Sequence, residues 1–152
     1  MAFTAGIRTI NSLATDQLVT SSVTPVDVTG FSFVIPPSRS IKWKVRAVFT
    51  LGATGGFRFL AHNTAAPIQY NFECTVRDLT TPATITPTSA GALVEAAFAN
   101  ASAVASNYQL EAEGFVTANA AVGTFSFQFA QNTSDVLSIS LQAGATFELI
   151  QF

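Results

Sequence analysis

The chain has 152 residues, of which 49% are hydrophobic and only 11% are charged, and its formal net charge is −2. About 25% of the residues of ordinary soluble domains are charged, so this length and composition predict one domain whose surface is unusually poor in charge. No block of Lys or Arg is present to replace phosphate counterions, and polar residues interrupt every apolar run before the roughly 18 positions of a membrane span, so we expect no nucleic-acid partner and no membrane.

Such a surface should expose apolar patches large enough to mark an interaction face. We therefore expect an obligate oligomer or a protein docked on a larger assembly. The alternative is a monomer with a neutral surface rich in Ser, Thr and Asn.

The first 15 residues contain Ile7, Ile10 and Leu13 at a spacing that suits one or two turns of helix. So short a helix is not stable alone in water, and contact with a neighbouring subunit would order it as an arm. A frayed terminus is the alternative. The segment lacks the cationic and continuous apolar regions of a signal peptide.

Residues 17–23 and 26–35 are predicted strands separated at Thr24-Pro25, because proline is confined to strand edges and bends. Residues 41–51 alternate most clearly, and one face of this strand carries Lys42, Lys44 and Arg46. Two interpretations are open. The cations pair across strands with Glu111 and Glu113 on a solvated sheet face, or they form a basic stripe that meets an acidic partner.

Residues 57–61 and 68–77 are further predicted strands. The only cysteine, Cys74, shares a face with Tyr70, Phe72 and Val76, which predicts a buried thiol, and a single cysteine excludes an intramolecular disulfide. Residues 80–107 are predicted to form a long loop with one short strand near residues 93–98.

The last 45 residues are predicted to form four short strands separated by turns, a rhythm typical of an all-β sandwich. In the final strand Phe147 and Leu149 point to one side, whereas Ile150 and Phe152 point to the other. A strand that is apolar on both faces is usually buried on both faces. We expect a second subunit to cover one of them.

Three segments of this region, EAEGFV (111–116), FSFQFAQN (125–132) and AGATFELIQF (143–152), resemble trimeric, tumour-necrosis-factor-like jelly-roll modules of bacteriophage virions. The matching positions are Gly114, Gly123, Ala130 to Asn132 and Ala143 to Gly144, whereas Ala145 stands where Ser is more usual. The resemblance covers the last 45 residues well and residues 16–80 loosely. It implies an antiparallel two-sheet jelly-roll sandwich over residues 16–152, preceded by a short N-terminal arm over residues 1–15.

Within that family the resemblance is to capsid decoration (cement) proteins. It implies a homotrimer on the capsid exterior that binds the major capsid protein and stabilises the shell. The expected oligomer interface comprises Phe115, Phe147, Leu149, Ile150 and Phe152. The expected contacts with the capsid or a neighbour are Phe3, Ile7, Ile10, Lys42, Lys44 and Arg46. A fibre-tip module that binds host-surface glycans is the alternative, and a cytoplasmic trimer unrelated to viruses is a third possibility.

The residues that support chemistry are few. One His and one Cys cannot build a metal cluster, so we expect no metal and no cofactor. His62, Asp78 and Asp135 satisfy a Ser-His-Asp triad by number alone, but no strand-turn-helix segment presents a nucleophilic serine. Glu111 and Glu113 lie about 7 Å apart on one strand face, where a solvated acidic row is the simpler interpretation. We expect no enzyme activity.

Overall fold

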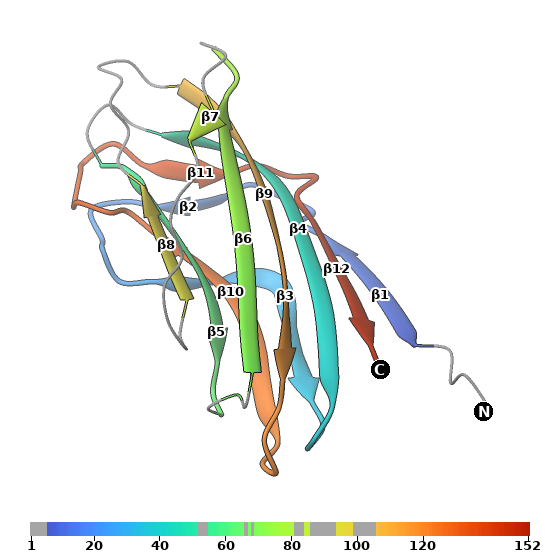
Figure 1. Cartoon of the computed structure of the whole chain (residues 1–152). Coiled ribbons are helices and arrows are strands. Elements are labelled where there is room, and N and C mark those ends of the chain that lie inside the picture. The colour runs from blue at the N-terminus through green and yellow to red at the C-terminus, as the bar shows by residue number, and fades with distance from the viewer. Residues whose placement is uncertain are drawn as a thin grey trace.

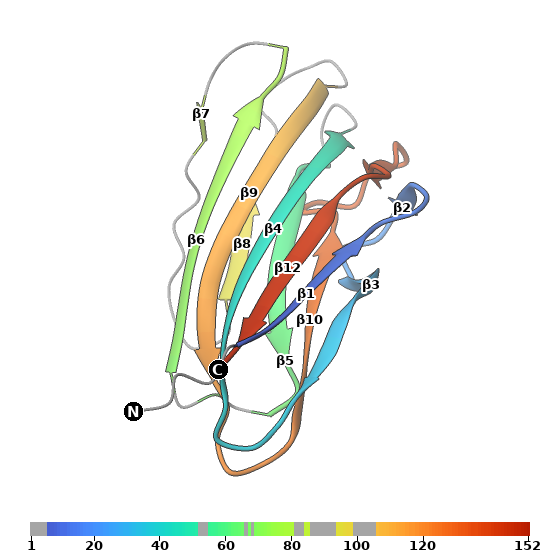
Figure 2. The same cartoon turned by 90° about the vertical axis from the view of Figure 1, so that its right-hand side faces the viewer.

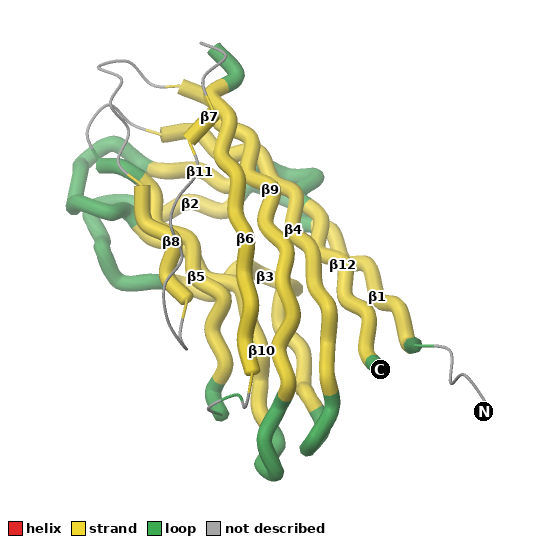
Figure 3. The backbone as a smooth tube through the Cα atoms, in the orientation of Figure 1, coloured by secondary structure: helices red, strands yellow, loops and turns green. Residues whose placement is uncertain are grey.

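The computed structural model describes residues 6–51, 55–65, 67, 69–80, 84–85, 94–98 and 106–152. All regular structure in these segments is β-strand, arranged as two antiparallel sheets packed face to face (Figures 1 and 3). The fold class predicted from the sequence is confirmed.

Within the described residues the larger sheet has eight strands and the smaller sheet has four. Across the larger sheet the order is β1 (Ile7–Ser12), β12 (Thr146–Gln151), β4 (Ser40–Leu51), β9 (Ser106–Thr117), β6 (Gln69–Asp78) and β7 (Thr84–Ile85), with β11 (Ile139–Leu141) beside β4 and β2 (Gln17–Val19) beside β11. Across the smaller sheet the order is β3 (Val26–Ile35), β10 (Gly123–Ala130), β5 (Phe57–Asn63) and β8 (Val94–Phe98).

The connections between strands give the sandwich its jelly-roll winding. The chain crosses from one sheet to the other at every connection from β2 to β6 and from β7 to β11, while β12 returns to lie between β1 and β4 (Figure 2). Two interlocked Greek keys of this kind define a jelly roll. Strands β6 and β7 come between β5 and β8 in the chain, and they widen the larger sheet beyond β9.

The core lies between the sheets and is mainly aromatic. Trp43 on β4 is buried and meets Phe127 on β10, with ring centroids 5.0 Å apart. Phe49 on the same face of β4 stacks on Phe57 at 4.0 Å. Phe125 and Phe129 are also fully buried, because alternate side chains of a strand point to the same face and residues 125, 127 and 129 of β10 all face the core. Because β4 and β10 belong to different sheets, their aromatic faces cover each other.

Gly114 on β9 makes room for Trp43, its partner in the β4 register. A Cβ atom at this position would approach Trp43 Cζ2 to 2.8 Å and would also collide with the backbone oxygen of Asn71. Glycine is therefore required here by close packing and not by an unusual backbone angle.

The first residues differ from the expectation. Residues 7–12 form strand β1, which pairs along its whole length with β12, so the helical interpretation of Ile7, Ile10 and Leu13 is wrong there. Pairing with a neighbouring strand outweighs the weak local preference of so short a segment. Phe3 lies outside the described residues. The strand predicted over 17–23 is shortened to β2, and the strand predicted near residues 93–98 is present as β8.

Candidate interaction faces

The outer face of the larger sheet is the side of β1, β12, β4, β9 and β6 that points away from the core. Directly opposite residues of antiparallel strands share a face, so the register places Lys44 between Glu148 and Glu113, and Glu73 next to Glu113. By this register the face carries five of the chain's 7 cationic side chains and four of its 9 acidic ones. They are Arg8, Lys42, Lys44, Arg46, Glu73, Arg77, Glu111, Glu113 and Glu148.

Three ion pairs cross this face between neighbouring strands. Arg8 Nε lies 2.7 Å from Glu148 Oε1, Lys44 Nζ lies 3.5 Å from Glu113 Oε2, and Arg46 Nε lies 3.6 Å from Glu111 Oε1. Of the two interpretations of the β4 cations, cross-strand pairing with Glu111 and Glu113 therefore holds for Lys44 and Arg46, whereas Lys42 forms no ion pair with a described residue. All six side chains are partly exposed, so each pair contributes at most about 1 kcal/mol to stability.

An apolar area interrupts the charges at the end of the sheet where β12 finishes. We call Phe115, Ile150 and Phe152 the C-terminal patch. In the register Ile150 and Phe115 lie on either side of Lys42, and Phe152 is 60% exposed. A shallow hollow of about 380 Å³ is lined by Phe115, Phe152, Lys42 and residues of β6 and β9. The patch presents large apolar side chains that the chain's own core leaves uncovered.

The predicted oligomer interface is divided by the structure. Phe147 and Leu149 are only 1% and 5% exposed, because they face the smaller sheet. The Phe147 ring lies 4.9 Å from that of Phe127 and 5.7 Å from that of Phe31. These two residues belong to the chain's own core and are not presented to a neighbour, so the expectation for them is corrected. Phe115, Ile150 and Phe152 remain accessible.

Of the predicted neighbour contacts, Ile7 and Ile10 on β1 are 67% and 58% exposed. Both faces of this edge strand are open, since Ile10 lies opposite Glu148 on the outer face and Ile7 lies opposite Gln151 on the inner face. Lys42 and Arg46 are exposed and Lys44 is half-buried.

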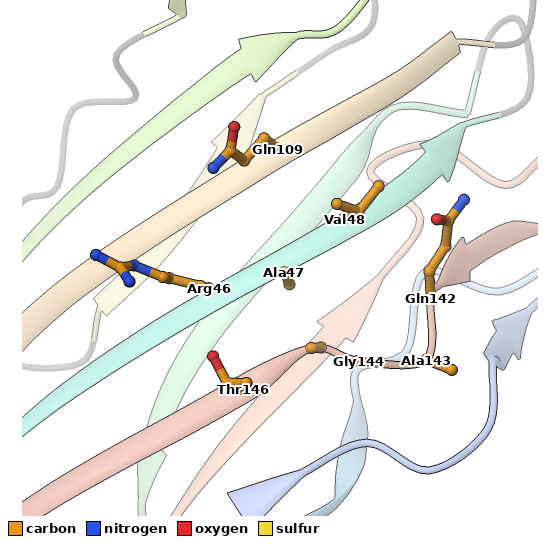
Figure 4. A pocket seen from close by; sticks show the side chains of 9 residues that line it. Arg46, Ala47, Val48, Gln109, Gln142, Ala143, Gly144 and Thr146 are labelled. Carbon is orange, nitrogen blue, oxygen red and sulfur yellow. The ribbon is translucent and has the colours of Figure 1, made fainter. Parts of the chain in front are cut away.

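A second hollow, of about 330 Å³, lies on the outer face where the turn between β11 and β12 meets β4 and β9 (Figure 4). Arg46, Gln109, Gln142 and Thr146 line it together with small residues of the turn. The Gln142 Nε2 atom donates to Thr50 Oγ1 at 2.8 Å, and the Gln109 Nε2 atom donates to Glu111 Oε1 at 3.3 Å. The hollow offers hydrogen-bonding groups, but its lining residues include no aromatic ring and no histidine or carboxylate that would activate the Thr146 hydroxyl.

A buried glutamine, which the sequence did not reveal, holds the loop between β10 and β11 by hydrogen bonds. Gln131 has no exposed surface. Its Oε1 atom accepts from the backbone N–H groups of Ser22 and Asp135, and its Nε2 atom donates to the carbonyls of Asp135 and Leu137. The loop so fixed exposes Val136 by 82%. A glutamine among polar turn residues gives no sequence signal of burial.

Two side chains with shifted pKa values, Cys74 and Tyr108, are both buried in the core. Burial raises the pKa of the Cys74 thiol to about 12, which confirms the buried thiol and makes it unreactive at neutral pH. Burial also raises the pKa of Tyr108, with a smaller contribution from Asp78, while a hydrogen bond with Ser106 lowers it.

The residues considered for a Ser-His-Asp triad lie on separate elements. His62 is on β5 of the smaller sheet, Asp78 ends β6 of the larger sheet, and Asp135 lies in the loop held by Gln131. Ser126 lies opposite His62, but its hydroxyl donates to Asp27 Oδ1 at 2.9 Å. No group of three metal-ligating side chains occurs in the described part of the chain. Nor does any helix there have the length and apolar character to cross a membrane.

No protein-family model matches the chain, and no curated protein sequence does. Among solved structures, the chain is similar to the VP2 subviral particle of infectious bursal disease virus and to a structure of the Gx strain of that virus. Both share 12% identity with a TM-score of 0.25, over 96% of this chain. The chain spans about 40% of the length of those chains. A likeness this weak carries no conclusion about function.

Proposed function

We propose that the chain is a virion structural protein, namely a capsid decoration (cement) protein that forms a homotrimer on the capsid exterior and binds the major capsid protein. The observation that carries this proposal is the C-terminal patch. Ile150 and Phe152 continue the strand that buries Phe147 and Leu149, yet they point out of a sandwich whose core is already complete. The sequence resemblance to phage jelly-roll modules gives the patch its proposed role.

The proposed function would depend on buried area. If each subunit buried about 1,000 Å² of apolar surface, the gross gain would be roughly 25 kcal/mol, which association and ordering costs offset in part. A protein that binds only the assembled shell shifts the equilibrium toward that shell by mass action. No catalytic group is required for this activity.

Two measurements test the proposal. Sedimentation at micromolar concentration should give a trimer, and mixing with undecorated expanded capsids should give saturable binding at a fixed number of copies per local three-fold position. A stable monomer would contradict the trimer, and the absence of saturable binding would contradict the decoration function.

A fibre-tip module that binds host-surface glycans is the second candidate, and the hollow in Figure 4 is the observation that favours it. Gln109, Gln142 and Arg46 could hydrogen-bond sugar hydroxyls there. A glycan-array signal that Gln109→Ala removes, together with no capsid binding, would favour this function over decoration.

A further inference from the structure

The ion pairs of the outer face leave two opposite charges unmatched beside the C-terminal patch. Lys42 lies between Ile150 and Phe115 in the register and forms no ion pair with any described residue. Glu73 lies opposite Glu113, whose charge Lys44 already meets, and it likewise has no cationic partner within the described residues. Like charges directly opposite each other destabilise a sheet. An external cation near Glu73 would remove that cost.

Lys42 and Glu73 line the same hollow of about 380 Å³ but are poorly placed to pair within one chain. Lys42 is on β4 and Glu73 is on β6, with β9 between them. Their strands are therefore about 9.6 Å apart, and the two residues are also offset by two positions along the strands, because Lys42 aligns with Phe115 whereas Glu73 aligns with Glu113. Both charges remain available to another molecule.

The outer face carries both positive and negative side chains, and this indicates which kind of partner can bind it. A face with one sign of charge would require a partner of the opposite sign. This face carries columns of cations on β4 and of carboxylates on β9, so a second copy shifted sideways can present each sign to its complement. In a ring of identical subunits, two different parts of the surface meet at each contact. A cation on β4 and a carboxylate on β6 are two such parts.

From this arrangement we propose that Lys42 of one subunit pairs with Glu73 of the next, and that the C-terminal patch packs beside this intersubunit pair. The inference rests on the proposed homotrimer and specifies its contact. Apolar area from Phe115, Ile150 and Phe152 supplies affinity, and the ion pair sets the relative position of the subunits.

Reversal of each charge tests the pair. Lys42→Glu and Glu73→Lys should each raise the protein concentration at half-dissociation by at least about tenfold, because each variant brings like charges together at the contact. The double variant carries both reversals in every subunit and so restores a pair of opposite charges at the contact. Its half-dissociation concentration should return to within about threefold of that of the unmodified chain. Sedimentation over a concentration series measures all three.

Arg77→Glu is the matched control. It reverses a cation of the same face that forms no ion pair with any described residue and that lies on β6 but outside the hollow, so it should leave the half-dissociation concentration unchanged. Denaturant unfolding of each variant separates a weakened contact from a weakened fold. Glu73→Lys should not destabilise the subunit, since it removes a like-charge neighbour of Glu113.

The outcomes separate this inference from the proposed function. Single variants that associate like the unmodified chain, or a double variant no better than the worse single variant, would overturn the Lys42–Glu73 contact and leave the trimer standing. An unmodified chain that stays monomeric at all concentrations would overturn both.

Discussion

The two faces of the larger sheet are built by the same strands and differ in almost every property. On β4 the inward side chains, including Trp43 and Phe49, are buried among aromatic rings, whereas the outward side chains Lys42 and Arg46 are exposed. On β12 the inward Phe147 belongs to the core, whereas Phe152, directly after the end of this strand, is exposed. A shift of one residue along a strand therefore separates side chains that stabilise the subunit from side chains available for assembly.

The largest difference between the faces should follow from truncation of the core. Trp43→Ala should lower the free energy of unfolding by about 3–5 kcal/mol, because it leaves a cavity that the packed rings cannot fill. Val48→Ala, on the outward side of the same strand, should cost about 1 kcal/mol or less. Guanidinium unfolding monitored by circular dichroism measures both. Equal losses for the two variants would show that the comparison between faces is mistaken.

Addition of one methyl group on the inner face should have the next largest effect. Gly114→Ala places a Cβ atom against the Trp43 ring and the Asn71 backbone, so it should cost about 1–3 kcal/mol. Glu113→Ala, one residue earlier and on the outer face, should change stability by about 1 kcal/mol at most. If Gly114→Ala unfolds at the same denaturant concentration as the unmodified chain, the close packing described here is absent.

Alkaline pH should weaken the inner face through Cys74. Its pKa is raised from an ordinary 9.0 to about 12, so in this interval the folded chain keeps a proton that the unfolded chain loses. Stability is fully present below about pH 9 and should fall by up to about 1.4 kcal/mol per pH unit until about pH 12. Tyr108, whose pKa is also raised, adds to the same trend.

Cys74→Ala is the control for this trend, since it lacks the thiol and should lose stability less steeply between pH 9 and pH 11. Parallel slopes for the two proteins would assign the trend to other groups.

The smallest effect should come from the ion pairs of the outer face. A double-mutant cycle on Lys44 and Glu113 should give a coupling of about 0.2–1 kcal/mol at low salt, which decreases toward zero at 1 M salt because the pair is exposed. The cycle is measured by urea unfolding at two salt concentrations. A coupling that salt does not change would indicate that the pair is shielded from solvent.

The sequence predicted the features that depend on alternation. The aromatic face of β10, the split between the faces of β4 and the two sides of β12 all follow from a period of two residues, which needs no knowledge of neighbours. The same parity places Lys44 and Arg46 on one face of their strand and Glu111 and Glu113 on one face of theirs, but that the two strands are neighbours came from the structure.

Features that depend on which strands become neighbours could not be predicted. The spacing of Ile7 and Ile10 suits a helix locally, and only the edge of β12 makes that segment a strand. Phe147 was expected at a subunit interface, since the alternation shows that it needs a cover but not that β3 and β10 of the same chain provide it. Burial of Gln131 depends on loops that meet only in the folded chain.

The pairing of β1 with β12 bears on how the chain folds during its synthesis. Strand β1 leaves the ribosome before β12, the strand that it pairs with among the described residues, so this edge of the sheet cannot form until the chain beyond Thr146 has emerged. Contacts between such distant segments form slowly, and until then the apolar inner side of β4 lacks the neighbour that β12 provides. We therefore expect nascent chains that end before residue 146 to bind chaperones that recognise exposed apolar segments.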